Sequence, residues 1–419
     1  MLWVGCSGVM VEYPVRIREK AQSPSSEERV EAIEYINTNI RRFDDIKDVW
    51  EDIHRLTQDE DKDIRRRAAC ALGWAFASVS DKDEAWEDIH RLTQDKDKNV
   101  RWNAADALRW AFAYMPDKGE AWEDIHRLTQ DEDTDVRGGA ADALGDVFAS
   151  VPGKDEAWED LHRLTRDKKE YVRRGATVAL GWAFPFVPDK DEAWKDLCRL
   201  TQDKDSGVRR WAASSLGLAF PFVPDKDRAW EDLHRLTQDR DKNVRNSTAC
   251  ALGEAFVDMP DKDRAWEALH RLTRDRSKDC LDCSVAFALG QAFVDMPDKD
   301  RAWEDIHRLT QDEDKQIRWR AVYALGAAFA SVPDKDEAWR DLHRLTQDED
   351  KRVRSSTAEV LGVAFASLPD KDRAWEALHL LTQDEDEAVR SSSAYALRMA
   401  VDYMPDKDKA REDLQRLSR

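Results

Sequence analysis

The sequence predicts an all-α protein, a right-handed α-solenoid of about ten two-helix repeats of 36 residues with a partial repeat capping each end. One phrase, Ala-Trp-Glu-Asp-Ile-His-Arg-Leu-Thr-Gln-Asp, returns almost unchanged along the chain, and its Trp recurs every 36 residues with a single step of 37. A period of roughly 20 to 50 residues is typical of a stacked array, so we expect one elongated body. The recurring tryptophans are Trp50, Trp86, Trp122, Trp158, Trp194, Trp230, Trp266, Trp303, Trp339 and Trp375.

Composition narrows the classes of function. A formal charge of -20 argues against a protein whose main role is to coat nucleic acid or anionic lipid, because both need a basic surface. Six cysteines without constant spacing indicate reduced thiols and a cytoplasmic location. The sequence has no apolar run long enough to span a membrane, and its first residues lack the basic start of a signal peptide.

The N-terminal part lies outside the repeat. Residues 1–26 are expected to form a lead and linker, and alternating apolar residues in 9–18 suggest an extended or strand-like segment. Ser25 and Glu28 have capping-box spacing, which predicts a helix over 27–43 that covers the first repeat. Ten repeats then fill 44–405, and 406–419 form a C-terminal capping helix.

Each repeat is expected to be a pair of helices. In the second repeat, Asp81 begins a first helix that continues to about residue 94. The second helix carries apolar residues at steps of three and four over 100–112 and ends before Pro116. Small residues in the second helix allow neighbouring helices to approach closely. A Phe closes this helix in nine of ten repeats, from Phe76 to Phe365, and is expected to be buried.

The pattern Asp-x-Asp-x-x-Val-Arg-x-x-Ala-Ala-x-Ala-Leu-Gly, as in residues 59–73, resembles the HEAT-like repeat of the phycobilisome-lyase type over residues 44–419. The resemblance implies the solenoid fold, with second helices lining its concave surface. It does not fix a function, because such repeats serve scaffolds, adaptors, regulators, chromophore lyases and an iron-dependent hydroxylase.

Two sets of recurring polar residues are expected to be structural. All nine histidines follow the repeated Trp by four residues, so the two side chains meet on the helix. Neighbouring histidines should lie about 10 Å apart, too far to share a metal ion. The recurring Arg after Val and the Asp after Thr-Gln suggest a second ladder between repeats. The Asp-x-Asp-x-Asp runs lack the Gly and Glu of a calcium loop, so capping is the favoured interpretation.

The positions that differ between repeats lie two, six and ten residues after the Val, and they form one stripe on each second helix. Five of the seven tryptophans outside the repeated phrase lie on this stripe. Exposed Trp, Tyr and Arg are the residue types that anchor protein interfaces, so we interpret the stripe as a binding face. The alternative is that these aromatic rings cover the helix of the next repeat. The candidate residues are Arg66, Trp74, Trp102, Asp106, Arg109, Trp110, Asp142, Arg174, Trp182, Arg210, Trp211, Trp319 and Tyr323.

The sequence contains three further local features, formed by glycines, prolines and cysteines. Gly138, Gly139 and Gly175 are expected to open a depression among the tryptophans and arginines, which would suit an acidic peptide, a phosphate or a stacked base. Prolines 185 and 221 are expected to interrupt two second helices and to expose the phenylalanines that follow them. Cys280 and Cys283 form a lone C-x-x-C in an irregular repeat, where a kink is favoured over a metal site because two further ligands are missing.

The leading functional hypothesis is a monomeric, non-catalytic scaffold that holds a protein or peptide along its concave face, without a cofactor. One alternative is a glycosylase of the DNA alkylation-repeat type, since Trp102 and Asp106 lie one helical turn apart and Trp182 is placed to face them. The acidic charge opposes it. A bilin-attachment role rests on family analogy alone. An iron hydroxylase would need paired His-Glu ligands, and no His here is followed by Glu.

Overall fold

The computed structural model describes residues 12–43, 46–274, 281–404 and 407–417, and within them it confirms the all-helical prediction. No extended strand occurs among these residues. The chain divides into two compact units, Met1–Val208 and Arg209–Arg419, which are described separately below. None of the described helices combines the length and apolar character needed to cross a membrane.

Helix pairs follow the 36-residue register through both units. The first helices of the pairs are α3 (Lys47–Leu56), α5 (Lys82–Leu92), α7 (Lys118–Leu128), α9 (Lys154–Leu164), α11 (Lys190–Leu200), α13 (Lys226–Leu236), α15 (Lys262–Leu272), α17 (Lys299–Leu309), α19 (Lys335–Leu345), α21 (Lys371–Leu381) and α23 (Lys407–Leu417). The second helices are α4 (Lys62–Ala75), α6 (Lys98–Ala111), α8 (Thr134–Val147), α10 (Glu170–Ala183), α12 (Ser206–Ala219), α14 (Lys242–Ala255), α16 (Leu281–Ala292), α18 (Lys315–Ala328), α20 (Lys351–Ala364) and α22 (Glu387–Ala400).

Aspartates begin both helices in most pairs, with Ile46, Gly153 and Lys169 at the starts of α3, α9 and α10 as exceptions. At α5, the Asp81 carboxylate accepts a hydrogen bond from the backbone N–H of Glu84 at 3.0 Å. At α6, Asp97 accepts from the N–H of Asn99 at 2.9 Å, and Asp95 accepts from the N–H of Asp97 at 2.8 Å. These bonds satisfy N–H groups that the first turn of a helix leaves unpaired. The Asp-x-Asp runs are therefore caps, as predicted.

Each second helix continues into one turn of 3-10 helix and then stops. In η5 (Phe184–Phe186) and η6 (Phe220–Phe222) the prolines lie inside this turn, after α10 and α12 have ended. The expectation that Pro185 and Pro221 interrupt the second helices is therefore wrong. Proline fits there because the first turn of a new helical segment does not need its N–H.

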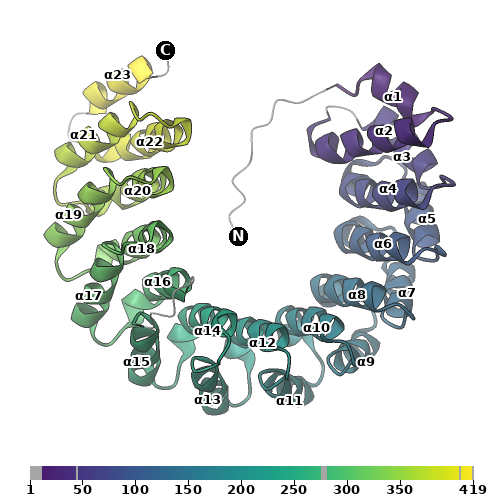
Figure 1. Ribbon diagram of the computed structural model, residues 1–419, viewed down its shortest axis with the longest axis horizontal. Coiled ribbons are helices and arrows are strands. Elements are labelled where there is room, and N and C mark those ends of the chain that lie inside the picture. The colour runs from purple at the N-terminus through teal and green to yellow at the C-terminus, as the bar shows by residue number, and fades with distance from the viewer. Residues whose placement is uncertain (1–11, 44–45, 275–280, 405–406, 418–419) are drawn as a thin grey trace. The chain divides into compact units, whose positions relative to one another are not determined.

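Within the first unit, α4, α6, α8 and α10 lie side by side in one layer, and the first helices form a second layer (Figure 1). The repeated Phe rings are at most 2% exposed and fill the space between the layers. Glycine permits the close approach of adjacent second helices, since a Cβ at Gly73 would lie 2.7 Å from the Cα of Ala107. The predicted use of small residues for close packing is confirmed at this contact.

The segment before the first repeat folds as a degenerate repeat. Residues 15–21 form helix α1 (Val15–Ala21), which corrects the strand-like expectation, and α2 (Ser26–Asn39) follows. Ser25 precedes α2, but its side chain makes no capping hydrogen bond, so the expected capping box is absent. Arg29 of α2 bonds Asp59 through Nε at 2.6 Å and Nη2 at 3.1 Å. This pair is in register with the arginine ladder described next.

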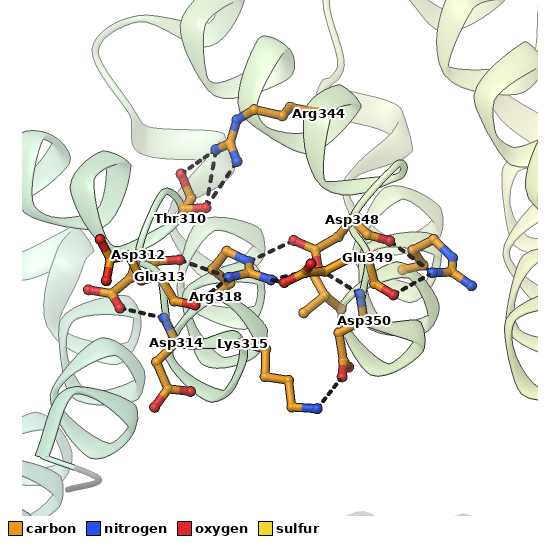
Figure 2. A network of polar contacts seen from close by, with 12 residues as sticks. Thr310, Asp312, Glu313, Asp314, Lys315, Arg318, Arg344, Asp348, Glu349 and Asp350 are labelled. Carbon is orange, nitrogen blue, oxygen red and sulfur yellow. Dashed lines mark hydrogen bonds and ion pairs between the residues drawn. The ribbon is translucent and has the colours of Figure 1, made fainter. Parts of the chain in front are cut away.

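A ladder of Arg–Asp ion pairs joins successive second-helix starts. Figure 2 shows one step, in which Arg318 Nε and Nη2 donate to the two carboxylate oxygens of Asp348 at 2.7 and 2.9 Å. Arg318 Nη1 donates to the carbonyl oxygens of Asp312 and Glu313 at 2.9 and 3.0 Å. The planar guanidinium fits this two-pronged arrangement of acceptors. The predicted Arg–Asp ladder between repeats is confirmed. The other pairs are Arg65–Asp95, Arg101–Asp131, Arg137–Asp167, Arg173–Asp203, Arg209–Asp239 and Arg354–Asp384.

A separate ladder of His–Asp hydrogen bonds joins the first helices. The ring of His90 packs on Trp86 with centroids 5.5 Å apart, and its Nδ1 lies 2.7 Å from Oδ2 of Asp124 in the next repeat. The packing and ladder role of the histidines is confirmed, while their aspartate partner, two residues after each Trp, was not anticipated from the sequence. The same bond joins His54–Asp88, His126–Asp160, His162–Asp196, His270–Asp305 and His307–Asp341.

The His–Asp ladder is interrupted within the second unit. Ala268 and Ala377 stand where the other first helices carry the aspartate, and Nδ1 of His234 is buried without a hydrogen-bond partner among the described residues. Burial lowers the pKa of His234, and the positive charges of Arg264 and Arg271 act in the same direction. Where the aspartate is missing, Nδ1 of His234 is a buried polar atom without a partner. In the other repeats with a His–Asp bond, the aspartate therefore satisfies this ring nitrogen.

We expect Arg318→Ala to destabilise its repeat by about 3 kcal/mol, because it leaves the Asp348 carboxylate without its main partner. Hydrogen exchange measured by mass spectrometry should show faster exchange in α18 and α20. Arg318→Lys, which keeps the charge and loses the two-pronged arrangement, should recover only part of the loss. Uniformly faster exchange throughout the chain would contradict the local character of the ladder.

We expect Ala268→Asp to stabilise the protein by about 1 kcal/mol, because the new carboxylate accepts from Nδ1 of His234. The pKa of His234, followed by NMR titration, should rise at the same time because a carboxylate favours the protonated ring. The reverse change, Asp305→Ala, removes the partner of His270 and should lower stability. A lower melting temperature for Ala268→Asp would show that the ladder does not depend on this bond.

Candidate functional site

The candidate site is the exposed side of the second-helix layer in the first unit, formed by α4, α6, α8 and α10. Four tryptophans lie on it: Trp74, Trp102, Trp110 and Trp182, whose exposures are 37, 37, 43 and 55%. The tryptophans of the repeated phrase are at most 9% exposed. The two sets of indole rings therefore differ in environment, and only the first is available to a partner. We call this surface the second-helix face.

The glycines of α8 do not open a depression. A Cβ on Gly138 would lie 2.2 Å from the Tyr171 ring, and one on Gly139 would lie 2.8 Å from the Trp102 ring. Trp102 of α6 and Tyr171 of α10 therefore lie over α8 from its two sides. The expected depression is filled by these two rings. Tyr171 is 41% exposed and was missed from the sequence because it does not lie on the stripe.

A group of carboxylates surrounds Arg109 between α6 and α8. Arg109 Nε forms an ion pair with Asp146, its Nη1 lies 3.9 Å from Asp106, and its guanidinium lies 5.1 Å from the centroid of the Trp110 ring. The Trp110 indole lies one helical turn after Asp106 on α6. The geometry brings four of the predicted site residues, Asp106, Arg109, Trp110 and Asp142, to one part of the face.

Burial raises the pKa of Asp142 to about 6, Arg109 opposes the rise, and the charges of Asp146 and Asp106 add to it. Burial also raises the pKa of Asp106. Both shifts have the same physical cause: two carboxylates are partly removed from water beside a third, and a single guanidinium is shared among them. Such groups interact favourably with an added positive charge.

The other predicted arginines of the face in the first unit lie beside carboxylates. Arg174 donates to both oxygens of Asp205, from Nε at 2.9 Å and from Nη2 at 3.0 Å, and its guanidinium covers Gly207. Arg66 Nε lies 3.8 Å from Asp63. Trp74 is contacted at 4.9 Å by the guanidinium of Arg41, which follows α2. The cations expected to meet an acidic partner are thus partly neutralised within the chain.

The predicted residues of the second unit divide into two kinds. Arg210 stacks at 5.2 Å on the exposed ring of Trp211. Trp319 Nε1 donates to Ser356 Oγ at 2.8 Å, and the Tyr323 hydroxyl donates to Glu359 at 3.1 Å. Both bonds reach the next repeat, so Trp319 and Tyr323 fit the alternative in which aromatic rings cover the following helix.

Other candidate features contribute no site. A surface hollow of about 770 Å³ is lined by ladder residues, including Arg101, His126 and Asp131, which recur in other repeats. Among the described residues, no group of three His, Cys, Asp or Glu side chains is placed to hold a metal ion. Cys280 and the side chain of Cys283 lie outside the described residues, so the C-x-x-C is not assessed by the structure.

The paired helices, their two ladders and the exposed second-helix layer define an α-solenoid built from helical hairpins. A family model described as HEAT repeats matches residues 53–123, 89–181, 123–217, 161–253 and 304–398. The chain belongs to the HEAT-repeat family. No comparison supports the narrower phycobilisome-lyase type, and no curated protein sequence matches the chain significantly.

Solved structures show the same fold at low sequence identity. Yeast importin-β (Kap95p) is 15% identical with a TM-score of 0.53, over 94% of this chain and 56% of that one. Importin β in an ammonium sulfate condition is 15% identical with a TM-score of 0.52, over 93% and 56%. A Kap121p mutant is 13% identical with a TM-score of 0.52, over 96% and 46%. The chain thus spans about half the length of these proteins, and the similarity establishes the fold alone.

We expect Asp142→Asn to raise the melting temperature near pH 7.5 and to have little effect near pH 4. A carboxyl whose folded-state pKa is raised from 3.8 to about 6 stabilises the fold least when it is ionised, so stability falls as pH rises through this range. The gain at neutral pH should be about 1–3 kcal/mol. Thermal unfolding across this pH range tests it, with Glu87→Gln on α5 as a control that should show no gain. An equal gain at both pH values would contradict it.

Proposed function

We propose that this protein is a non-catalytic interaction scaffold that holds a segment of a partner protein along the second-helix face. The observation that carries the proposal is the exposure of four tryptophans on the second helices α4, α6 and α10, whereas the ten repeated tryptophans are buried. A large aromatic side chain left in water is costly unless a partner covers it, and Trp is among the residues most enriched at binding hot spots.

Two further features support a scaffold. A stacked array presents a long surface whose chemistry varies from repeat to repeat while the framework stays constant, as the stripe and the ladders do here. The chain's family is built in this way, although fold alone does not assign function. The particular partner, a cytoplasmic location and a monomeric state remain parts of the proposal.

The structure supports the alternative functions less well than it supports a scaffold. The alkylation-repeat proposal needs a surface that attracts phosphates, and the part of the face around Trp102 and Asp106 carries two further carboxylates, Asp142 and Asp146. Trp102 also packs on Gly139, which gives it a role within the fold. No specific observation favours a bilin or iron-dependent activity.

We expect Trp110→Ala and Trp182→Ala each to weaken partner binding by about 30-fold or more while leaving helicity and the melting temperature nearly unchanged. The partner is first captured from native lysate with the wild-type chain, and its affinity is then measured for each variant. Tyr114→Ala is the matched control, because this aromatic side chain is 54% exposed in η3 (Phe112–Tyr114) and lies off the stripe. Equal loss of binding in the control, or loss of folding in the tryptophan variants, would contradict the proposal.

A further inference from the structure

The part of the second-helix face between α6 and α8 carries a negative charge, which the arginines in its sequence do not suggest. Between α6 and α8, three carboxylates, Asp106, Asp142 and Asp146, face one guanidinium, that of Arg109. Arg174, the next arginine of the face, has both carboxylate oxygens of Asp205 as its partners. The exposed ring of Trp110 is therefore accompanied by an excess of negative charge, although the sequence places several arginines on this face.

The carboxylates and an exposed ring are arranged together. Asp106 and Trp110 are one helical turn apart on α6, and Asp142 and Asp146 are one turn apart on α8. Arg109 lies over the Trp110 ring and takes Asp146 as its ion-pair partner. Among the described residues, no cation forms an ion pair with Asp142, and Arg109 acts on it through its charge. The face thus presents an aromatic surface beside a carboxylate that lacks a direct ion pair.

We propose that the partner segment is cationic, and that one of its lysine or arginine side chains docks between α6 and α8 with its methylenes on Trp110 and its charge beside Asp142 and Asp106. This inference rests on the proposed function and names the chemistry of the partner. A long basic side chain fits because its apolar stem covers aromatic surface while its charged end reaches the carboxylates. It also offsets the repulsion among the three aspartates.

The same charges disfavour other occupants. An acidic peptide, which the sequence suggested through its arginines, would bring carboxylates toward Asp142 while Arg109 and Arg174 are already engaged. A nucleic acid would meet the same repulsion through its phosphates.

The test measures binding of the full chain to two short fluorescent peptides by anisotropy. One peptide combines lysine, leucine and serine, and the other has glutamate in place of each lysine. The wild-type chain should bind the lysine peptide more tightly, and Asp106→Asn/Asp142→Asn should weaken this binding by about tenfold. Glu87→Gln/Glu123→Gln removes the same charge from exposed positions on α5 and α7, and its effect should stay below about twofold.

The outcomes separate this inference from the proposed function. Tighter binding of the glutamate peptide, binding of neither peptide, or equal effects of the two double variants would each overturn the cationic assignment. If Trp110→Ala still abolishes capture of the natural partner in those cases, the scaffold proposal stands and only the partner chemistry is wrong. Circular dichroism and melting temperature establish that both double variants are folded.

Discussion

The Arg–Asp pair between successive repeats is the interaction on which the rest of the structure depends. Its arginine satisfies two carbonyl oxygens of the turn in its own repeat and both carboxylate oxygens of the next one, as Arg318 does with Asp348. Asp348 in turn accepts from the N–H of Asp350, which caps the next second helix. One side chain therefore fixes the turn, the helix start and the spacing of the neighbour. This leaves the outward positions of the second helix free to vary.

The repeated framework of helices, caps and buried side chains could be predicted from the sequence because the same residues recur in each repeat. A residue that recurs at one register position, such as the buried Phe or the Asp caps, has the same environment in each copy. Periodicity alone therefore gave the helix pairs, the caps and the arginine ladder. The His–Asp bond was missed because it joins residues 34 positions apart on helices whose rotation the pattern does not define. Its visible signal was the replacement of this aspartate by Ala268 and Ala377 in two of the repeats.

The candidate site was predicted less completely because its residues occur once. The sequence located the stripe, and four of its tryptophans are exposed on α4, α6 and α10. It did not show that Trp102 and Tyr171 fill the space above Gly138 and Gly139, since side chains from two other repeats converge there. Nor did it show that Arg174 meets Asp205. Which charges remain unpaired depends on contacts between non-repeated residues, and periodicity does not report these.

The N-terminal segment has a consequence for how such a chain can change in length. Asp52 of α3 occupies the ladder position that accepts from a histidine in later repeats, and here Tyr13 donates to it at 3.0 Å and Gln22 at 3.4 Å. The closing end is thus matched to an ordinary repeat and needs no specialised first unit. Whole 36-residue modules can be gained or lost internally while the same end group still fits, so the length of the second-helix face can evolve by duplication independently of the residues that vary along it.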